Sequence, residues 1–165
     1  MKKIDPFILG IIFFLLVVLI GGVVFAYKGG GESMQTYTTQ DQDRPQAEIS
    51  TQLVDLGEMK VSDTKSADFI IKNVGNRPLQ INNISTSCDC TFAEVTIGDS
   101  VSPRFTMHQN PQWTGEIGSG QEAKVMAIYE PAIMPVKGKV ERTIYLKTND
   151  PQNPEITLAI TAAVN

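Results

Sequence analysis

The stretch EITLAITAAV, residues 155–164, decides the fold of this chain. Its large apolar side chains recur at every second position, which is the pattern of a β-strand that buries one face. A helix would instead repeat its apolar residues at every third or fourth position. The inward face of this predicted strand consists of Ile156, Leu158, Ile160, Ala162 and Val164.

The same period of two recurs upstream, in residues 67–73, 79–82, 121–130 and 143–147, and a further strand is expected near 47–56. No segment after residue 28 keeps a helical period. About seven short strands separated by turns predict an all-β fold, an immunoglobulin-like antiparallel β-sandwich. The alternation assigns these side chains to the core: Phe69, Ile71, Ile81, Val125, Ile144, Leu158 and Ile160.

The chain begins with a long apolar segment that carries no charge from Phe7 to Phe25. At about 1.5 Å per residue, a helix of this length nearly spans a hydrocarbon core of roughly 30 Å. Lys2 and Lys3 precede the run, which favours a cytoplasmic N-terminus. We expect one transmembrane helix, a signal anchor in residues 1–28, with the remainder extracytoplasmic.

A cleaved signal peptide is the alternative interpretation of the same segment. Residues 24–26, Val-Phe-Ala, would suit a signal peptidase, although the apolar run is longer than the usual core of about 7–15 residues. In both interpretations the rest of the chain is exported from the cytoplasm. Residues 29–46 open with three glycines and continue polar, which predicts a flexible linker, and residues 47–165 are expected to form one sandwich domain.

The charge balance excludes some partners. The chain has 14 Lys and Arg against 18 Asp and Glu, and the first 28 residues hold Lys2, Lys3 and Lys28 against Asp5 alone, so the remainder is more acidic than the whole. An acidic domain without a basic cluster is a poor ligand for nucleic acid. It is also repelled by anionic lipid, so the membrane contact is expected to be the helix alone.

The only two cysteines, Cys88 and Cys90, are separated by one residue, and Met107 and the only histidine, His108, come later in the chain. Two thiolates, a thioether and an imidazole form a soft ligand set, which favours Cu(I), with zinc less suitable. Met107 and His108 are neighbours in the chain, so both can reach one ion only from a turn. The sequence therefore predicts a metal site formed by these four side chains.

Other roles for the cysteine pair stay open. At a strand end, residues i and i+2 lie about 6.5–7 Å apart, so a Cys88–Cys90 disulfide would be strained, because a disulfide prefers a Cα separation of about 5.5–6 Å. The two residues could equally be small buried side chains. A thiol redox role is the remaining interpretation.

Four segments in this order resemble a known family: NVGNRPLQI at 73–81, TSCDCT at 86–91, GSGQ at 118–121 and KTNDP at 147–151. The chain resembles an uncharacterised bacterial immunoglobulin-like family related to the ASPM–SPD-2–Hydin and major-sperm-protein domains. The resemblance covers about residues 50–165, with an insertion at about 93–117. It implies a seven-stranded extracytoplasmic sandwich, and it implies no established activity.

Enzymatic motifs are missing from the sequence. His108 belongs to no nucleophile–base motif, and the glycines at 118 and 120 precede a strand rather than a phosphate-binding helix. We expect no enzyme, but a membrane-anchored binding module that holds a soft metal. The alternatives are a metal-free adaptor for a protein partner in an envelope complex and a thiol redox protein.

Overall fold

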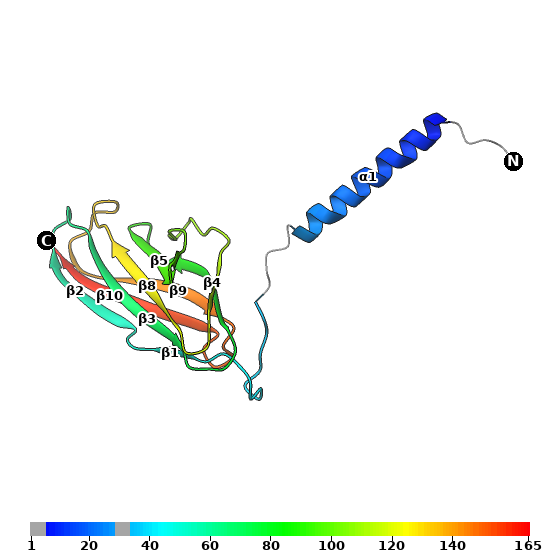
Figure 1. Ribbon diagram of the computed structural model, residues 1–165. Helices are drawn as coiled ribbons and strands as arrows, with labels where there is room; N and C mark the ends of the chain where they lie inside the picture. The colour runs from blue at the N-terminus through cyan, green and yellow to red at the C-terminus, as the bar shows by residue number, and fades with distance from the viewer. Residues whose placement is uncertain (1–5, 29–33) are drawn as a thin grey trace. The chain divides into compact units, whose positions relative to one another are not determined.

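A computed structural model describes residues 6–28 and 34–165 (Figure 1). The chain divides into two compact units, Met1–Ser33 and Met34–Asn165. In the first unit, helix α1 (Pro6–Lys28) contains the whole uncharged run. Pro6 suits the first helical position, because its φ is already helical and its missing N–H would have no partner there.

Nowhere in the described residues does a helix meet the length and hydropathy required to cross a bilayer. The helical conformation of the apolar run agrees with the sequence analysis. That the helix crosses a membrane stays a prediction. Residues 1–5 of the expected anchor and 29–33 of the expected linker lie outside the described residues.

The second unit is an immunoglobulin-like sandwich of ten strands in two five-stranded sheets, which confirms the predicted all-β class. One sheet has the order β1-β3-β8-β5-β6 and the other β2-β10-β9-β4-β7; Figure 1 shows them as two layers. The strands are β1 (Ala47–Ile49), β2 (Leu53–Met59), β3 (Lys65–Asn73), β4 (Leu79–Thr86), β5 (Thr91–Ile97), β6 (Ser100–Val101), β7 (Thr114–Ile117), β8 (Glu122–Tyr129), β9 (Gly138–Thr148) and β10 (Glu155–Val164).

The predicted inward side chains form the core between the sheets. All seven are at most 1% exposed: Phe69, Ile71, Ile81, Val125, Ile144, Leu158 and Ile160. The face assignment from the period of two is therefore confirmed.

Several features differ from the sequence-based expectation, beginning with the number of strands, which is ten rather than about seven. The segment expected as an insertion contains most of β5 and all of β6 and β7, and β6 and β7 are too short to show a period. The single strand expected near 47–56 is two strands in different sheets, and β2 pairs with β10 in parallel rather than antiparallel. The chain changes sheet between β1 and β2, which brings β2 alongside β10.

The outer edge of β2 is covered by a side chain from the opposite sheet. Lys65 donates from Nζ to the carbonyl oxygens of Leu56, at 2.7 Å, and Glu58, at 2.8 Å. Unpaired carbonyl groups on an edge strand invite pairing with another chain. Here the lysine satisfies two of them.

Strand β4 contains an irregularity that sets the orientation of its C-terminal end. Its inward residues are Leu79 and Ile81, but the next ones are Ile84 and Thr86, so one extra residue is accommodated. The pairing with β9 shifts register at this point, and Asn83 has a positive φ of 48°, a conformation that asparagine tolerates better than most residues. The shift keeps the end of β4 facing inward.

Residues 34–46 lie along the sandwich and belong to its compact unit, which begins at Met34 rather than at Ala47. Gln35 N–H donates to Gln80 Oε1 at 2.8 Å, and Arg44 N–H donates to Asn76 Oδ1 at 3.1 Å. We call residues 34–46 the strap. Its polar composition predicts a flexible linker, but in the structure these residues form hydrogen bonds with the domain.

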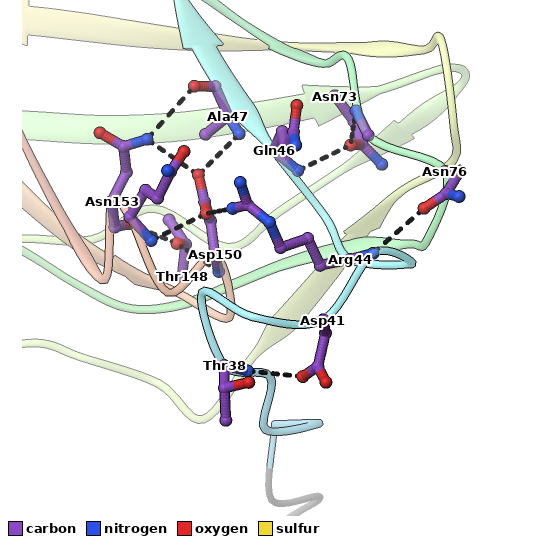
Figure 2. A network of polar contacts seen from close by, with 12 residues as sticks. Thr38, Asp41, Arg44, Gln46, Ala47, Asn73, Asn76, Thr148, Asp150 and Asn153 are labelled. Atoms are coloured by element: carbon purple, nitrogen blue, oxygen red, sulfur yellow. Dashed lines mark hydrogen bonds and ion pairs between the residues drawn. The ribbon is translucent and has the colours of Figure 1, made fainter.

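The strap and β1 meet at the buried carboxylate of Asp150, in the turn between β9 and β10. Figure 2 shows Arg44, Ala47 and Asn153 around it. The guanidinium of Arg44 lies 3.5 Å away, Ala47 N–H donates at 2.9 Å, and Asn153 Nδ2 donates at 2.8 Å. Asp150 is 1% exposed, so these contacts replace its lost hydration.

Gly75 allows the strap to approach this closely. A Cβ atom at this position would overlap with the backbone of residues 44–46. The neighbouring Asn73 side chain accepts from Gly75 N–H at 3.0 Å and from Gln46 N–H at 3.3 Å. The NVGN part of the turn before β4 is therefore the receptor for the strap.

Replacing Asp150 with alanine is expected to lower the free energy of unfolding by about 3 kcal/mol, because it leaves a partly buried N–H and a largely buried guanidinium without their acceptor. Urea unfolding followed by the fluorescence of Trp113 measures the loss. The matched control is Asp68→Ala, which removes a solvent-exposed ion pair with Lys124 and should cost less than about 1 kcal/mol. Equal losses in the two variants would contradict this role of Asp150.

Candidate functional site

The cysteine pair lies in a tight turn between β4 and β5. Thr91 N–H donates to the Cys88 carbonyl at 3.1 Å, which closes the turn. The buried Thr86 hydroxyl lies 2.8 Å from the same carbonyl and 2.9 Å from the carbonyl of Thr91. Because Thr86 faces inward after the β4 irregularity, the turn is directed into the end of the core.

Cys88 and Cys90 are joined by a disulfide, with their Cα atoms 5.1 Å apart. The wider separation expected at a strand end is wrong, because the residues form a turn instead. Of the roles left open by the sequence, this structure has the disulfide, and in this state neither sulfur is a thiolate ligand for a metal.

The two sulfurs have different surroundings. Cys88 is 7% exposed and Cys90 is fully buried. Cys88 Sγ accepts a hydrogen bond from Cys90 N–H at 3.1 Å and lies 3.6 Å from Met134 Sδ. Cys90 Sγ accepts from Arg142 Nε at 3.4 Å. The outer sulfur therefore faces a thioether, and the inner one faces a cation.

Arg142 occupies an inward position of β9, in phase with the buried Ile144 and Leu146. Its guanidinium lies 5.5 Å from the ring centre of Tyr129, a cation–π contact. The Tyr129 hydroxyl is buried and has no hydrogen-bond partner among the described residues. A charged side chain on the inward face of a strand is unusual, and it ends the apolar core beside the disulfide.

The other two predicted metal ligands lie elsewhere in the same region. His108 Nδ1 pairs with Asp89 Oδ2 at 2.7 Å, both side chains being largely exposed. This hydrogen bond lowers the pKa of Asp89. The pair therefore stabilises the fold at pH values above the ordinary pKa of an aspartate, and this contribution is lost as the pH falls through the lowered pKa. Met107 is half exposed.

His108 thus contacts the residue between the cysteines rather than their sulfurs. No cluster of three or more His, Cys, Asp or Glu side chains suited to a metal occurs within the described ranges. The thioether beside Cys88 belongs to Met134.

The segment that carries Met107 and His108 is fixed by its aromatic residues. Phe105 is buried and exchanges two backbone hydrogen bonds with Ala93 of β5, at 3.0 and 2.9 Å. Its ring packs on Trp113 at a centroid distance of 5.9 Å. Thr106 then accepts from the N–H groups of His108 and Gln109, and this turn directs His108 toward Asp89.

Sequence reasoning missed Met134 and Arg142. Met134 lies in the loop 130–137 between β8 and β9, among Ile133 and Val136, which are also exposed. Apolar residues between Pro131 and Pro135, outside any strand period, were the available signal for this loop. For Arg142 the signal was a charge at an inward position of the β9 alternation.

Residues 45–163 match the family model described as HYDIN/CFA65/VesB-like, Ig-like domain. The chain belongs to this family. The predicted relation to Hydin-type domains is therefore confirmed. No curated protein matches the chain significantly.

Solved structures share the fold at low sequence identity. A protein of unknown function from Porphyromonas gingivalis W83 has a TM-score of 0.56 and 20% identity, over 76% of this chain and 50% of that one. PapD-like domain 7 of human CEP192 has a TM-score of 0.51 and 12% identity, over 82% and 96%. A family 123 glycoside hydrolase from Clostridium perfringens has a TM-score of 0.52 and 10% identity, over 74% of this chain and 27% of that one. This chain thus spans half of the Porphyromonas protein, and these likenesses show the fold alone.

Proposed function

We propose that this chain is a membrane-anchored, extracytoplasmic binding module that presents the Cys88–Cys90 end of its sandwich to a partner protein in the envelope, and that it is not an enzyme. The observation that carries the proposal is the loop 130–137. Its three largest apolar side chains, Ile133, Met134 and Val136, are 48%, 52% and 38% exposed. One of them, Met134, contacts the disulfide turn.

The loop has the chemistry of a protein-binding surface. Burying one large aliphatic side chain contributes about 1.5–3 kcal/mol, so three together can anchor a contact. Pro131 and Pro135 restrict the backbone, which lowers the entropy lost when the loop is held by a partner. Methionine adapts its shape to an apolar surface. The partner expected is therefore a protein with a matching apolar patch.

Two further observations support the membrane and extracytoplasmic parts of the proposal. The run from Phe7 to Phe25 carries no charge, and α1 contains all of it. The only two cysteines form a disulfide, and such bonds persist mainly in exported proteins.

A photo-reactive amino acid at Ile133 is expected to give a discrete cross-linked product with one envelope protein in cells. Val136→Ser in the same chain should reduce its yield several-fold, because it removes part of the apolar contact. The control position is Val101, which is exposed on β6. Equal products from both positions, or none from Ile133, would refute the binding surface.

The predicted topology has its own test. A tag at the C-terminus should be removed by external protease in cells whose outer membrane, if there is one, has been opened first. Protection of the tag would refute export. A mature N-terminus at Tyr27 would refute the anchor alone, because it would mean that the apolar run is a cleaved signal peptide.

A second candidate function is the binding of Cu(I) after reduction of the disulfide. The 3.6 Å between Cys88 Sγ and Met134 Sδ favours it, because sulfurs that share one ion at about 2.3 Å lie roughly 4 Å apart. Two thiolates and a thioether suit Cu(I) better than zinc. In this proposal Met134 takes the place that was predicted for Met107, and His108 is not a ligand.

The reduced full chain is then expected to bind one Cu(I) in competition with a colorimetric chelator. Met134→Leu should weaken binding more than Met107→Leu, and the double variant Cys88→Ser, Cys90→Ser should abolish it. The same titration with zinc should show weaker binding. If the double variant binds Cu(I) as the wild type does, the metal proposal fails.

A further inference from the structure

We propose that Cys88–Cys90 is a redox-active disulfide that exchanges with an external dithiol, with Cys88 as the sulfur attacked and Cys90 as the leaving thiolate, stabilised by Arg142. This is a chemical activity beyond the binding role proposed above, and it does not depend on that role.

The charge of Arg142 has little use in the oxidised state. Across the described part of the chain this side chain forms no ion pair with a carboxylate; it donates to the Glu141 carbonyl at 2.9 Å and to Cys90 Sγ at 3.4 Å. A disulfide sulfur is neutral and a weak acceptor, so it gains little from the cation. A thiolate at the same position would form a charge-assisted hydrogen bond with it.

The two sulfurs differ in their access to an external thiol. Cys88 is 7% exposed and Cys90 is fully buried, so an incoming thiolate reaches Cys88 first. Met134 lies against Cys88 Sγ but is itself half exposed, so it can move aside. Attack on Cys88 makes Cys90 the leaving group, and Cys90 is the sulfur that faces Arg142.

Cys88 also has a donor for its reduced form. Its sulfur already accepts the N–H of Cys90 at 3.1 Å. A backbone N–H directed at sulfur stabilises a thiolate. Both sulfurs therefore have a donor in place before reduction, which lowers the free energy of the reduced form with thiolates relative to the disulfide.

The reaction balances as two successive exchanges. A thiolate of the external dithiol bonds to Cys88 Sγ, and the electron pair of the Cys88–Cys90 bond goes to Cys90 as a thiolate. The second thiol of the reagent, deprotonated, then attacks the reagent sulfur and releases Cys88. The reagent becomes a disulfide, its two electrons reduce the cysteine pair, and its two protons are available to Cys88 and Cys90.

The equilibrium with glutathione, measured on the full chain in mild detergent, tests the role of Arg142 as a positioning residue. Arg142→Met should shift the equilibrium about tenfold toward the disulfide, equivalent to about 30 mV. Arg142→Lys should recover most of the shift, because it keeps the charge. The control is Arg104→Met, since Arg104 also places a charge over an aromatic ring, that of Phe92, but pairs with the carboxylates of Glu94 and Glu130 rather than with a cysteine; it should leave the equilibrium unchanged.

Each other outcome of this measurement overturns the proposal. Equal shifts for Arg142→Met and Arg104→Met would mean that the contact between Arg142 and Cys90 Sγ is not responsible, because both variants lose a charge and a ring contact. No shift for Arg142→Met, or an Arg142→Lys variant identical to it, would mean that the cation does not stabilise a thiolate.

The site of attack is tested separately with glutathione as a monothiol probe. After alkylation of free thiols, fragment mass spectra should find glutathione on Cys88. Met134→Ala should accelerate reduction by dithiothreitol several-fold, because it uncovers that sulfur, whereas Met107→Ala should not. Glutathione found on Cys90, or equal rates in the two methionine variants, would overturn the assignment of the attacked sulfur.

Discussion

The carboxylate of Asp150 is the point at which the separate parts of the sandwich are joined. It lies in the turn between the two longest strands, β9 and β10. It accepts hydrogen bonds from Ala47 of β1 and from Asn153 of its own turn, and it forms an ion pair with Arg44 of the strap. A buried carboxylate is costly unless all these partners are present. Asp150 therefore couples the two sheets and the strap in the folded state. No disulfide joins the two sheets, because the only two cysteines pair within one turn.

The disulfide turn depends on that frame at the other end of β4. The extra residue at Asn83 changes the phase of the strand, so that Thr86 faces inward and holds the carbonyls of the turn. Arg142 arrives at the same place from β9, which is fixed by β10 along its whole length. Rigid strands thus determine which sulfur meets the cation, and this asymmetry is the basis of the redox proposal.

Features that repeat along a strand were predictable from the sequence. The inward residues of β3, β8 and β10 followed from alternation, and the Cys-Asp-Cys segment was recognisable as unusual. The partners of the cysteines were not predictable in this way. Met107 and Met134 look equivalent in the sequence, and only the paths of the two loops bring Met134 to Cys88. The strap escaped detection for a related reason, since its polar residues are also typical of a linker and its binding depends on the space above Gly75.

Lys65, which covers the edge of β2, affects how readily two copies of this chain can pair edge to edge. The edge of this sheet would otherwise offer free carbonyl groups to a neighbouring copy, and repeated addition there would give an open-ended fibre. With Nζ of Lys65 bonded to two of those oxygens, a second molecule must first break both contacts and desolvate an ammonium group. The same side chain that completes a local hydrogen-bond set therefore opposes edge-to-edge pairing between copies.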